Sequence, residues 1–164
     1  MKTVLAALGM AAIASASQAG AQKMNDVQQQ VQQQVQVQSK AGKVLVTLSV
    51  ANGTGKPVHV PKAVFEDDEL FGRAFDIIHV GTGAVVDYIG PMVKRGPLTK
   101  DDYLAVQAGG KHANVIDITR SYAFKPGKHD YQLTFAGNWL GNVAKLDAAS
   151  TATVAPVKFS HTGK

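Results

Sequence analysis

The sequence predicts an all-β protein, and in particular an immunoglobulin-like antiparallel β-sandwich. Two observations lead to this expectation. Short runs of β-branched and aromatic residues recur at spacings of about ten residues from Lys43 onward, with glycine, proline and polar turn residues between them. Helical periodicity is weak and short throughout the same region, which disfavours β-α-β units. Antiparallel strands joined by turns are the arrangement that fits both patterns.

The first 21 residues have the composition of a secretory signal peptide. Lys2 provides the basic start, an apolar run extends from Val4 to Ala14, and Ala19 and Ala21 have the small-residue spacing of a cleavage site. Cleavage after Ala21 leaves 143 residues, a length typical of one domain. No later stretch reaches the roughly 20 apolar residues that a membrane-spanning helix needs. We therefore expect a periplasmic or extracellular protein without membrane insertion.

Cysteine content and charge limit the kinds of protein that this sequence can encode. The sequence contains no cysteine, so we expect neither disulfides nor a lipid anchor on a cysteine, and stability must come from packing. The formal net charge is +5, with basic residues scattered singly or in pairs. A nucleic-acid groove typically shows clustered Lys and Arg with interleaved aromatic residues. The composition therefore does not favour a nucleic-acid partner.

A glutamine-rich segment follows the signal peptide. Val27, Val31 and Val35 would lie near one another on a helix, yet they would also share one face of a strand. Polar tracts of low complexity bury little apolar surface. We predict a flexible leader over residues 22–34, a sandwich domain over 35–160 and a C-terminal tail over 161–164, with a partner-binding helix in the leader as the alternative.

The predicted strands follow in chain order. Lys43 to Val50 alternates apolar and polar residues, ANGTGK provides a turn, and PVHVPKAVF forms the next run. A closing strand is expected from Thr151 to Phe159, after a loop that begins at Gly137. Short helical turns are expected within 66–75 and after Thr99, which is a good N-cap residue. The remaining strands are predicted over 74–80, 84–90, 102–108, 112–118 and 129–135.

Catalytic and metal-binding signatures are weak. Neighbouring histidines are at least 17 residues apart in sequence, there is no HExxH pair, and no G-x-S-x-G elbow occurs. The acidic run Glu66–Glu69 offers oxygen ligands, but it lacks the glycine turn typical of a calcium loop, and a solvated loop is the preferred interpretation. We therefore expect no enzyme activity and no cofactor.

Aromatic residues offer a different hypothesis, a carbohydrate-binding platform. Its members would be Tyr88, Tyr103, Tyr122, Tyr131 and Trp139. Tyr131 alternates with other apolar residues in HDYQLTF, which is the pattern of a residue that points into the core. The core interpretation is preferred for it.

The stretch YIGPMVKRGPLTKDDY, from Tyr88 to Tyr103, contains two prolines and two glycines among charged residues. Proline ends strand pairing and favours turns, so this stretch is typical of a loop that crosses between sheets. Lys94 and Arg95 would then lie on a surface loop, paired with Asp101 or Asp102. Contact with a partner, or proteolytic processing after Arg95, are the alternatives.

The same stretch carries a resemblance. Its Tyr88-x-Gly90, Lys94-Arg95-Gly96, Pro97-x-Thr99 and Asp102-Tyr103 elements resemble the N-terminal module of secreted bacterial metallopeptidases of the deuterolysin and peptidyl-Lys metalloendopeptidase family. Downstream, the resemblance continues through Gly109, Asp117, Tyr122, Pro126, Gly127 and Tyr131, and it covers about residues 35 to 160. In that family the module is a pro-region before a zinc peptidase domain, whereas this sequence stops at Lys164.

The resemblance implies a secreted, non-enzymatic binding module. Its expected partner is a secreted metallopeptidase, on which it would act as an inhibitor or folding helper. The expected contact residues are Lys94, Arg95, Gly96, Pro97, Asp102 and Tyr103. Two alternatives remain: an adhesion, carbohydrate-binding or envelope-structural sandwich, and an uncharacterised enzyme.

Overall fold

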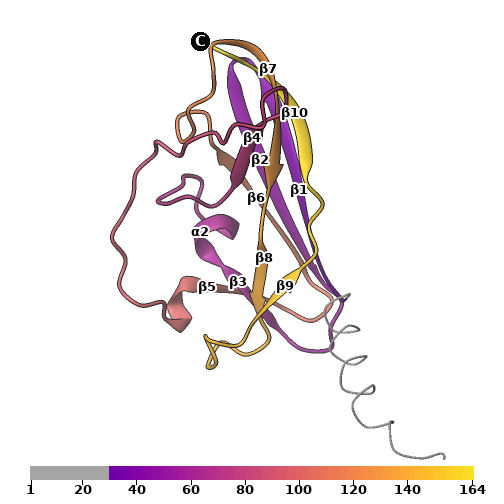
Figure 1. Cartoon of the computed structure of the whole chain (residues 1–164). Helices are drawn as coiled ribbons and strands as arrows, with labels where there is room; N and C mark the ends of the chain where they lie inside the picture. The colour runs from indigo at the N-terminus through magenta and orange to yellow at the C-terminus, as the bar shows by residue number, and fades with distance from the viewer. Residues whose placement is uncertain (1–29) are drawn as a thin grey trace, which may run out of the picture.

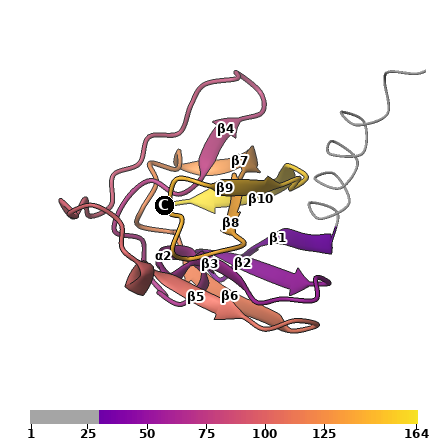
Figure 2. The same ribbon diagram turned by 90° about the horizontal axis from the view of Figure 1, so that it is seen from below.

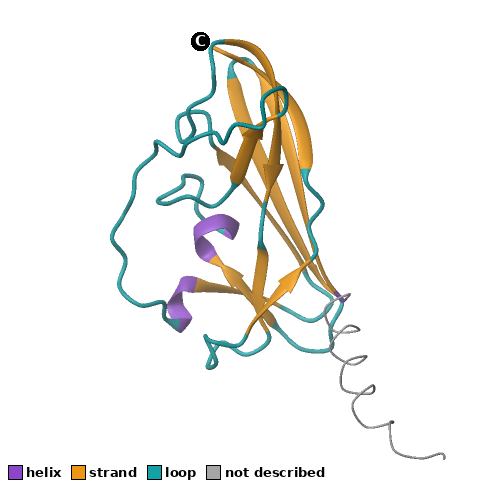
Figure 3. Ribbon diagram, in the orientation of Figure 1, coloured by secondary structure: helices purple, strands orange, loops and turns teal. Residues whose placement is uncertain are grey.

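The computed structural model describes residues 30–164, which form three antiparallel sheets and two short helical turns (Figures 1 and 3). The predicted signal peptide, residues 1–21, and residues 22–29 of the predicted leader lie outside the described part. Within residues 30–164, no helix has the length and apolar character needed to cross a membrane. The predicted all-β class is confirmed.

The sheets stack as a sandwich. One layer contains the sheet β1-β2-β6, formed by Val31–Lys40, Lys43–Asn52 and Lys111–Asp117. The facing layer contains β10-β7-β4, formed by Val157–Gly163, Gly127–Thr134 and Asp76–His79, as the end-on view shows (Figure 2). A third sheet closes one end in the order β5-β3-β8-β9, formed by Tyr103–Val106, Val58–Pro61, Gly137–Leu140 and Ala149–Ala152. The helical turns are α2 (Lys62–Phe65) and η1 (Lys100–Asp102).

The β1-β2 hairpin is the longest paired unit. Its ten residue pairs run from Val31 opposite Asn52 to Lys40 opposite Lys43. Ala41 and Gly42 form the turn with φ values of 52° and 76°, the left-handed conformation that a tight two-residue hairpin turn requires. Val31 and Val35 of β1 point inward with Gln33, whereas Gln32, Gln34, Gln36 and Gln38 point to solvent.

The predicted leader therefore ends too late. Residues 31–34 belong to β1, since Val31 is 2% exposed and Gln33 is 4% exposed. The Gln33 side-chain amide also donates to the Gly137 carbonyl oxygen at 3.2 Å. Alternating valine and glutamine is a half-buried strand pattern, and β2 supplies a partner long enough to order it.

Other boundaries also differ from the prediction. The segment 84–90 forms only isolated bridges, between Ile78 and Val85 and between Tyr88 and Tyr122. The closing strand is interrupted before Val157, where Pro156 lacks an amide donor, and so becomes β9 and β10. The predicted tail 161–164 lies mostly in β10, because that strand continues to Gly163.

Two smaller elements also differ from the prediction, and a third agrees with it. Residues 137–140, predicted as loop, form β8. The helical turn expected within 66–75 is absent, and α2 precedes it instead. The turn expected after Thr99 is confirmed as η1.

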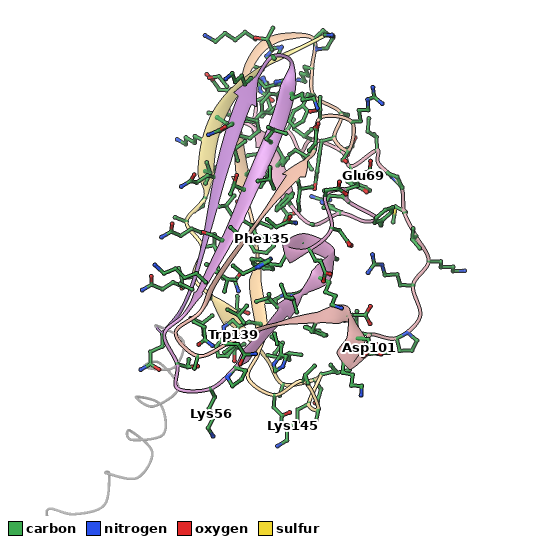
Figure 4. All side chains as sticks on the ribbon, turned by 180° about the vertical axis from the view of Figure 1, so that it is seen from behind. Lys56, Glu69, Asp101, Phe135, Trp139 and Lys145 are labelled. Carbon is green, nitrogen blue, oxygen red and sulfur yellow. The ribbon has the colours of Figure 1, made fainter. Side chains whose placement is uncertain are left out.

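The core lies between the two stacked layers. It is rich in valine from β1 and β2 and in aromatic residues from the facing sheet. Tyr131 is fully buried, as its alternation predicted, and packs edge-on against Phe124. Figure 4 shows Trp139 among the strands, whereas Lys56 and Lys145 extend from the loops at one end. Burial of apolar surface on this scale is the main stabilising contribution for a chain without disulfides.

Candidate binding loop

The loop formed by residues 89–99 is the most exposed long segment of the described structure. It leaves the sandwich after the Tyr88 bridge, runs along one side of the molecule and returns at η1 (Figure 1). Every residue from 91 to 100 is exposed. This is the stretch that the sequence predicted as a crossing between sheets.

The first end of the 89–99 loop is anchored on Tyr88. The Tyr88 hydroxyl lies 3.0 Å from the Leu70 carbonyl oxygen and 2.7 Å from the Pro91 carbonyl oxygen. The Ile89 amide donates to the Ser121 carbonyl oxygen at 2.9 Å. A Cβ atom at position 90 would lie 2.7 Å from the Tyr88 hydroxyl oxygen, which explains the glycine there. These contacts fix the direction in which the 89–99 loop leaves the sandwich.

The other end is fixed by a capping box. The Thr99 amide donates to the Asp102 carboxylate at 2.8 Å, and the Thr99 hydroxyl donates to the same oxygen at 3.0 Å. The Asp101 amide in turn donates to the Thr99 hydroxyl at 3.3 Å. The backbone hydrogen bond from Thr99, followed by its hydroxyl, lowers the pKa of Asp102, because both favour the charged carboxylate. Asp102 therefore acts first as a structural cap.

Between these anchors the loop exposes apolar side chains. Met92 is 81% exposed, and Ile89, Val93 and Leu98 are each more than half exposed. Neighbouring Phe71 is 39% exposed. Single exposed apolar residues are ordinary, but several on one segment are typical of an interaction surface.

Two hollows border the loop. One, of about 520 Å³, is lined by Phe71, the segment 93–98 and Asp102. The other, of about 900 Å³, is bordered by Ile89 and Pro91 and has Tyr122 among its walls. The loop therefore contributes to the walls of both hollows.

The structure places most of the predicted contact residues together. Lys94, Arg95, Gly96, Pro97 and Asp102 all line the smaller hollow. Tyr103 is absent from that lining and pairs with Pro61 at the start of β5.

Within residues 30–164, Lys94 and Arg95 do not form the predicted ion pairs with Asp101 or Asp102, although the charge of Arg95 is one of the smaller causes that lower the pKa of Asp102. The Arg95 guanidinium lies 3.9 Å from the Asp67 carboxylate, and the four ion pairs within residues 30–164 do not include Lys94. Asp102 is engaged by Thr99, and Asp67 is held in place because the Asn114 side-chain amide donates to its carbonyl oxygen at 2.6 Å. The Lys94 ammonium therefore remains available to a partner.

The acidic run Glu66–Glu69 and the aromatic residues, which the sequence offered as further candidate sites, form neither a metal site nor an aromatic platform within residues 30–164. Glu66 of the acidic run lies 3.8 Å from Lys62, and Asp67 faces Arg95. Within residues 30–164 no group of three or more His, Cys, Asp or Glu side chains could hold a metal ion. The five-residue aromatic platform does not form, because Tyr122, Tyr131 and Trp139 are buried.

The apolar residues of the loop were missed by the sequence analysis. Ile89, Met92, Val93 and Leu98 stand among glycines and prolines, without the alternation of a strand or the spacing of a helix. Apolar residues without periodicity in a turn-rich segment are the signal that would have identified them.

The fold and the loop define an all-β sandwich protein with an exposed loop that carries apolar and basic side chains. No family model and no curated protein matches the chain. Among solved structures, one described as the X-ray structure of Northeast Structural Genomics Consortium target SoR45 is similar, with a TM-score of 0.43 and 10% identity. The match covers 79% of this chain and 84% of that chain. The resemblance to metallopeptidase pro-regions stays a prediction from the residues.

Proposed function

We propose that this protein is a secreted, non-enzymatic binding module that docks its 89–99 loop on a protein partner. The observation that carries the proposal is the exposure of Met92 and its apolar neighbours beside Lys94, which forms no ion pair with any of residues 30–164. Methionine is among the residues enriched at interface cores, and a charged side chain beside it contributes specificity.

The anchoring of the loop supports this role. Tyr88 fixes one end, and the Thr99–Asp102 capping box fixes the other. Pro91 and Pro97 restrict the backbone between them. A loop that is ordered before binding loses less conformational entropy in the complex, so more of the contact free energy appears as affinity.

The proposed partner is a secreted zinc metallopeptidase, on which the module acts as an inhibitor or folding helper. The sequence resemblance to pro-regions of that class supports this choice. The resembled family is selective for lysine, and Lys94 is the side chain that would enter an acidic lysine pocket, with Arg95 as a flanking contact. The segment 89–98 contains no serine, cysteine, histidine or carboxylate, which favours binding over catalysis by the loop.

The test uses a purified lysine-selective secreted zinc peptidase. Its activity and its refolding yield are measured against increasing amounts of the wild-type protein, of Met92→Ser and of Lys94→Ala. We expect each variant to weaken the effect by about 30-fold, the equivalent of about 2 kcal/mol for an interface anchor. Lys128→Ala, at an exposed residue of β7, is the matched control and should behave as wild type. Equal potency of all four proteins, or no effect of the wild type on either measurement, would contradict the proposal.

A further inference from the structure

Two histidines that are 50 residues apart in sequence meet at one end of the β4-β7 pair. His79 ends β4 and lies opposite Tyr131, two residues from His129 on the same face of β7. The His79 Nε2 atom is 3.1 Å from the His129 Nδ1 atom, and the ring centroids are 5.0 Å apart. Both side chains are partly exposed. The pair lies outside the hydrogen bonds that anchor the 89–99 loop.

The outer nitrogens show where the hydrogen atoms are. His129 Nε2 lies 2.9 Å from the Pro126 carbonyl oxygen, which only accepts, so this nitrogen carries a hydrogen. His79 Nδ1 lies 3.2 Å from the Thr82 amide nitrogen, which only donates, so Nδ1 is an acceptor. The two inner nitrogens therefore share one hydrogen, carried by His79 Nε2 and accepted by His129 Nδ1.

We propose that His79 and His129 bind one divalent transition-metal ion, which takes the place of this shared hydrogen. With metal–nitrogen bonds of about 2.0–2.1 Å, inner nitrogens 3.1 Å apart subtend an angle of about 100° at the metal. That angle fits adjacent positions of tetrahedral or square-planar coordination. Imidazole pairs favour Cu²⁺ over Zn²⁺ and Ni²⁺, as the Irving–Williams order predicts.

One of the two outer hydrogen bonds is already the kind that metal-bound histidines usually make. His129 already donates its outer hydrogen to Pro126. In His79 the hydrogen moves from Nε2 to Nδ1, where the Thr82 hydroxyl oxygen, 3.0 Å away, accepts it, and the hydrogen bond that the Thr82 amide donates to Nδ1 is lost. The neutral pair thus binds the ion without net release of a proton. The edge-on contact of His79 with Tyr131, at a centroid distance of 5.7 Å, limits rotation of the ring.

The site has two protein ligands. Within residues 30–164 no third His, Cys, Asp or Glu completes it. His161 lies opposite His129 in the strand register, but its Nδ1 atom is 2.9 Å from the Ser39 hydroxyl. Water fills the remaining coordination positions, because both imidazoles reach the surface. An open site of this kind binds less tightly than a closed four-ligand site.

The test is a titration of the purified protein with Cu²⁺, followed by calorimetry and electron paramagnetic resonance. We expect one Cu²⁺ per chain bound through two imidazole nitrogens. His79→Ala and His129→Ala should each weaken this binding at least about 10-fold, and Thr82→Val should weaken it about 10-fold because it removes the outer acceptor. His59→Gln, in strand β3 of another sheet, is the control and should bind as wild type.

Unchanged affinity in both His79→Ala and His129→Ala would overturn the proposal. If these two variants fail to fold, the wild-type protein is titrated with Zn²⁺ and its imidazole nitrogen resonances are followed. These resonances show whether His79 and His129 are the metal ligands. His79 and His129 should then shift together and before His59, His112 and His161. A response that begins at any of those three histidines would equally reject the site.

Discussion

The hydroxyl group of Tyr122 satisfies both backbone polar groups of Phe75. It accepts from the Phe75 amide at 3.0 Å and donates to the Phe75 carbonyl oxygen at 2.8 Å. Tyr122 follows the end of β6, and Phe75 directly precedes β4, so this contact joins the two layers. The phenol is 2% exposed, and its burial raises the pKa of Tyr122 to about 12.

We expect Tyr122→Phe to lower the free energy of unfolding by about 2–3 kcal/mol, because two buried backbone groups lose their partner. Urea unfolding measures the change. Tyr103→Phe is the matched control, since Tyr103 is partly exposed, and it should change stability by less than about 0.5 kcal/mol. Equal losses in the two variants would show that the Tyr122 hydroxyl has no special role.

The raised pKa of Tyr122 predicts alkaline destabilisation. The folded state favours the neutral phenol, so this contribution is fully present below pH 10 and is lost as the pH rises from 10 toward about 12. Wild-type protein should lose more stability over this interval than Tyr122→Phe does. Urea unfolding curves of both proteins at several pH values in this interval check this difference. The same pH dependence of stability in the two proteins would show that Tyr122 is not the group responsible.

His161 predicts a loss of stability in acid. Burial lowers the pKa of this imidazole, because the charged form is poorly solvated in the interior. The unfolded state therefore binds the proton more readily, so the stabilisation is present above the unfolded pKa of about 6.5 and is lost as the pH falls below it. Urea midpoints between about pH 7.5 and pH 5 should move less in His161→Gln than in wild type. An identical shift would exclude His161 as a contributor.

The start of β1 predicts a sharp limit to N-terminal truncation. Removal of residues 31–34 in addition to the preceding segment should cost about 3 kcal/mol or more, because Val31 and Gln33 are buried and paired with β2. A chain that starts at Gln30 is the matched comparison. Similar melting temperatures for chains starting at Gln30 and at Val35 would show that the first four residues of β1 contribute little.

Lys94→Arg tests the shape of the proposed lysine pocket. The guanidinium is larger and planar, so we expect this variant to lose part of the inhibition or refolding effect while its melting temperature stays that of wild type. Lys94 is exposed, which makes a large change in stability unexpected. Full retention of the effect in both Lys94→Arg and Lys94→Ala would show that the Lys94 side chain does not make the proposed contact.

Local patterns in the sequence determined the parts of the fold that depend on neighbouring residues. Alternation between Lys43 and Val50 predicted a half-buried strand, and β2 has that pattern. Tyr131 was expected in the core and is buried, and Thr99 was expected to cap a turn and does so. Side-chain periodicity and capping act over a few residues, so one sequence is enough to show them.

Tertiary structure decided the features that depend on a distant partner. Residues 31–34 became strand because β2 was long enough to pair with them, whereas 84–90 has an equally suitable composition and makes only isolated bridges. The Arg95–Asp67 ion pair forms across the surface because Asn114 holds the Asp67 backbone in place. His79 and His129 meet solely through the register of β4 on β7. Strand register and exposure are set by packing between remote segments, and local composition carries no record of that packing.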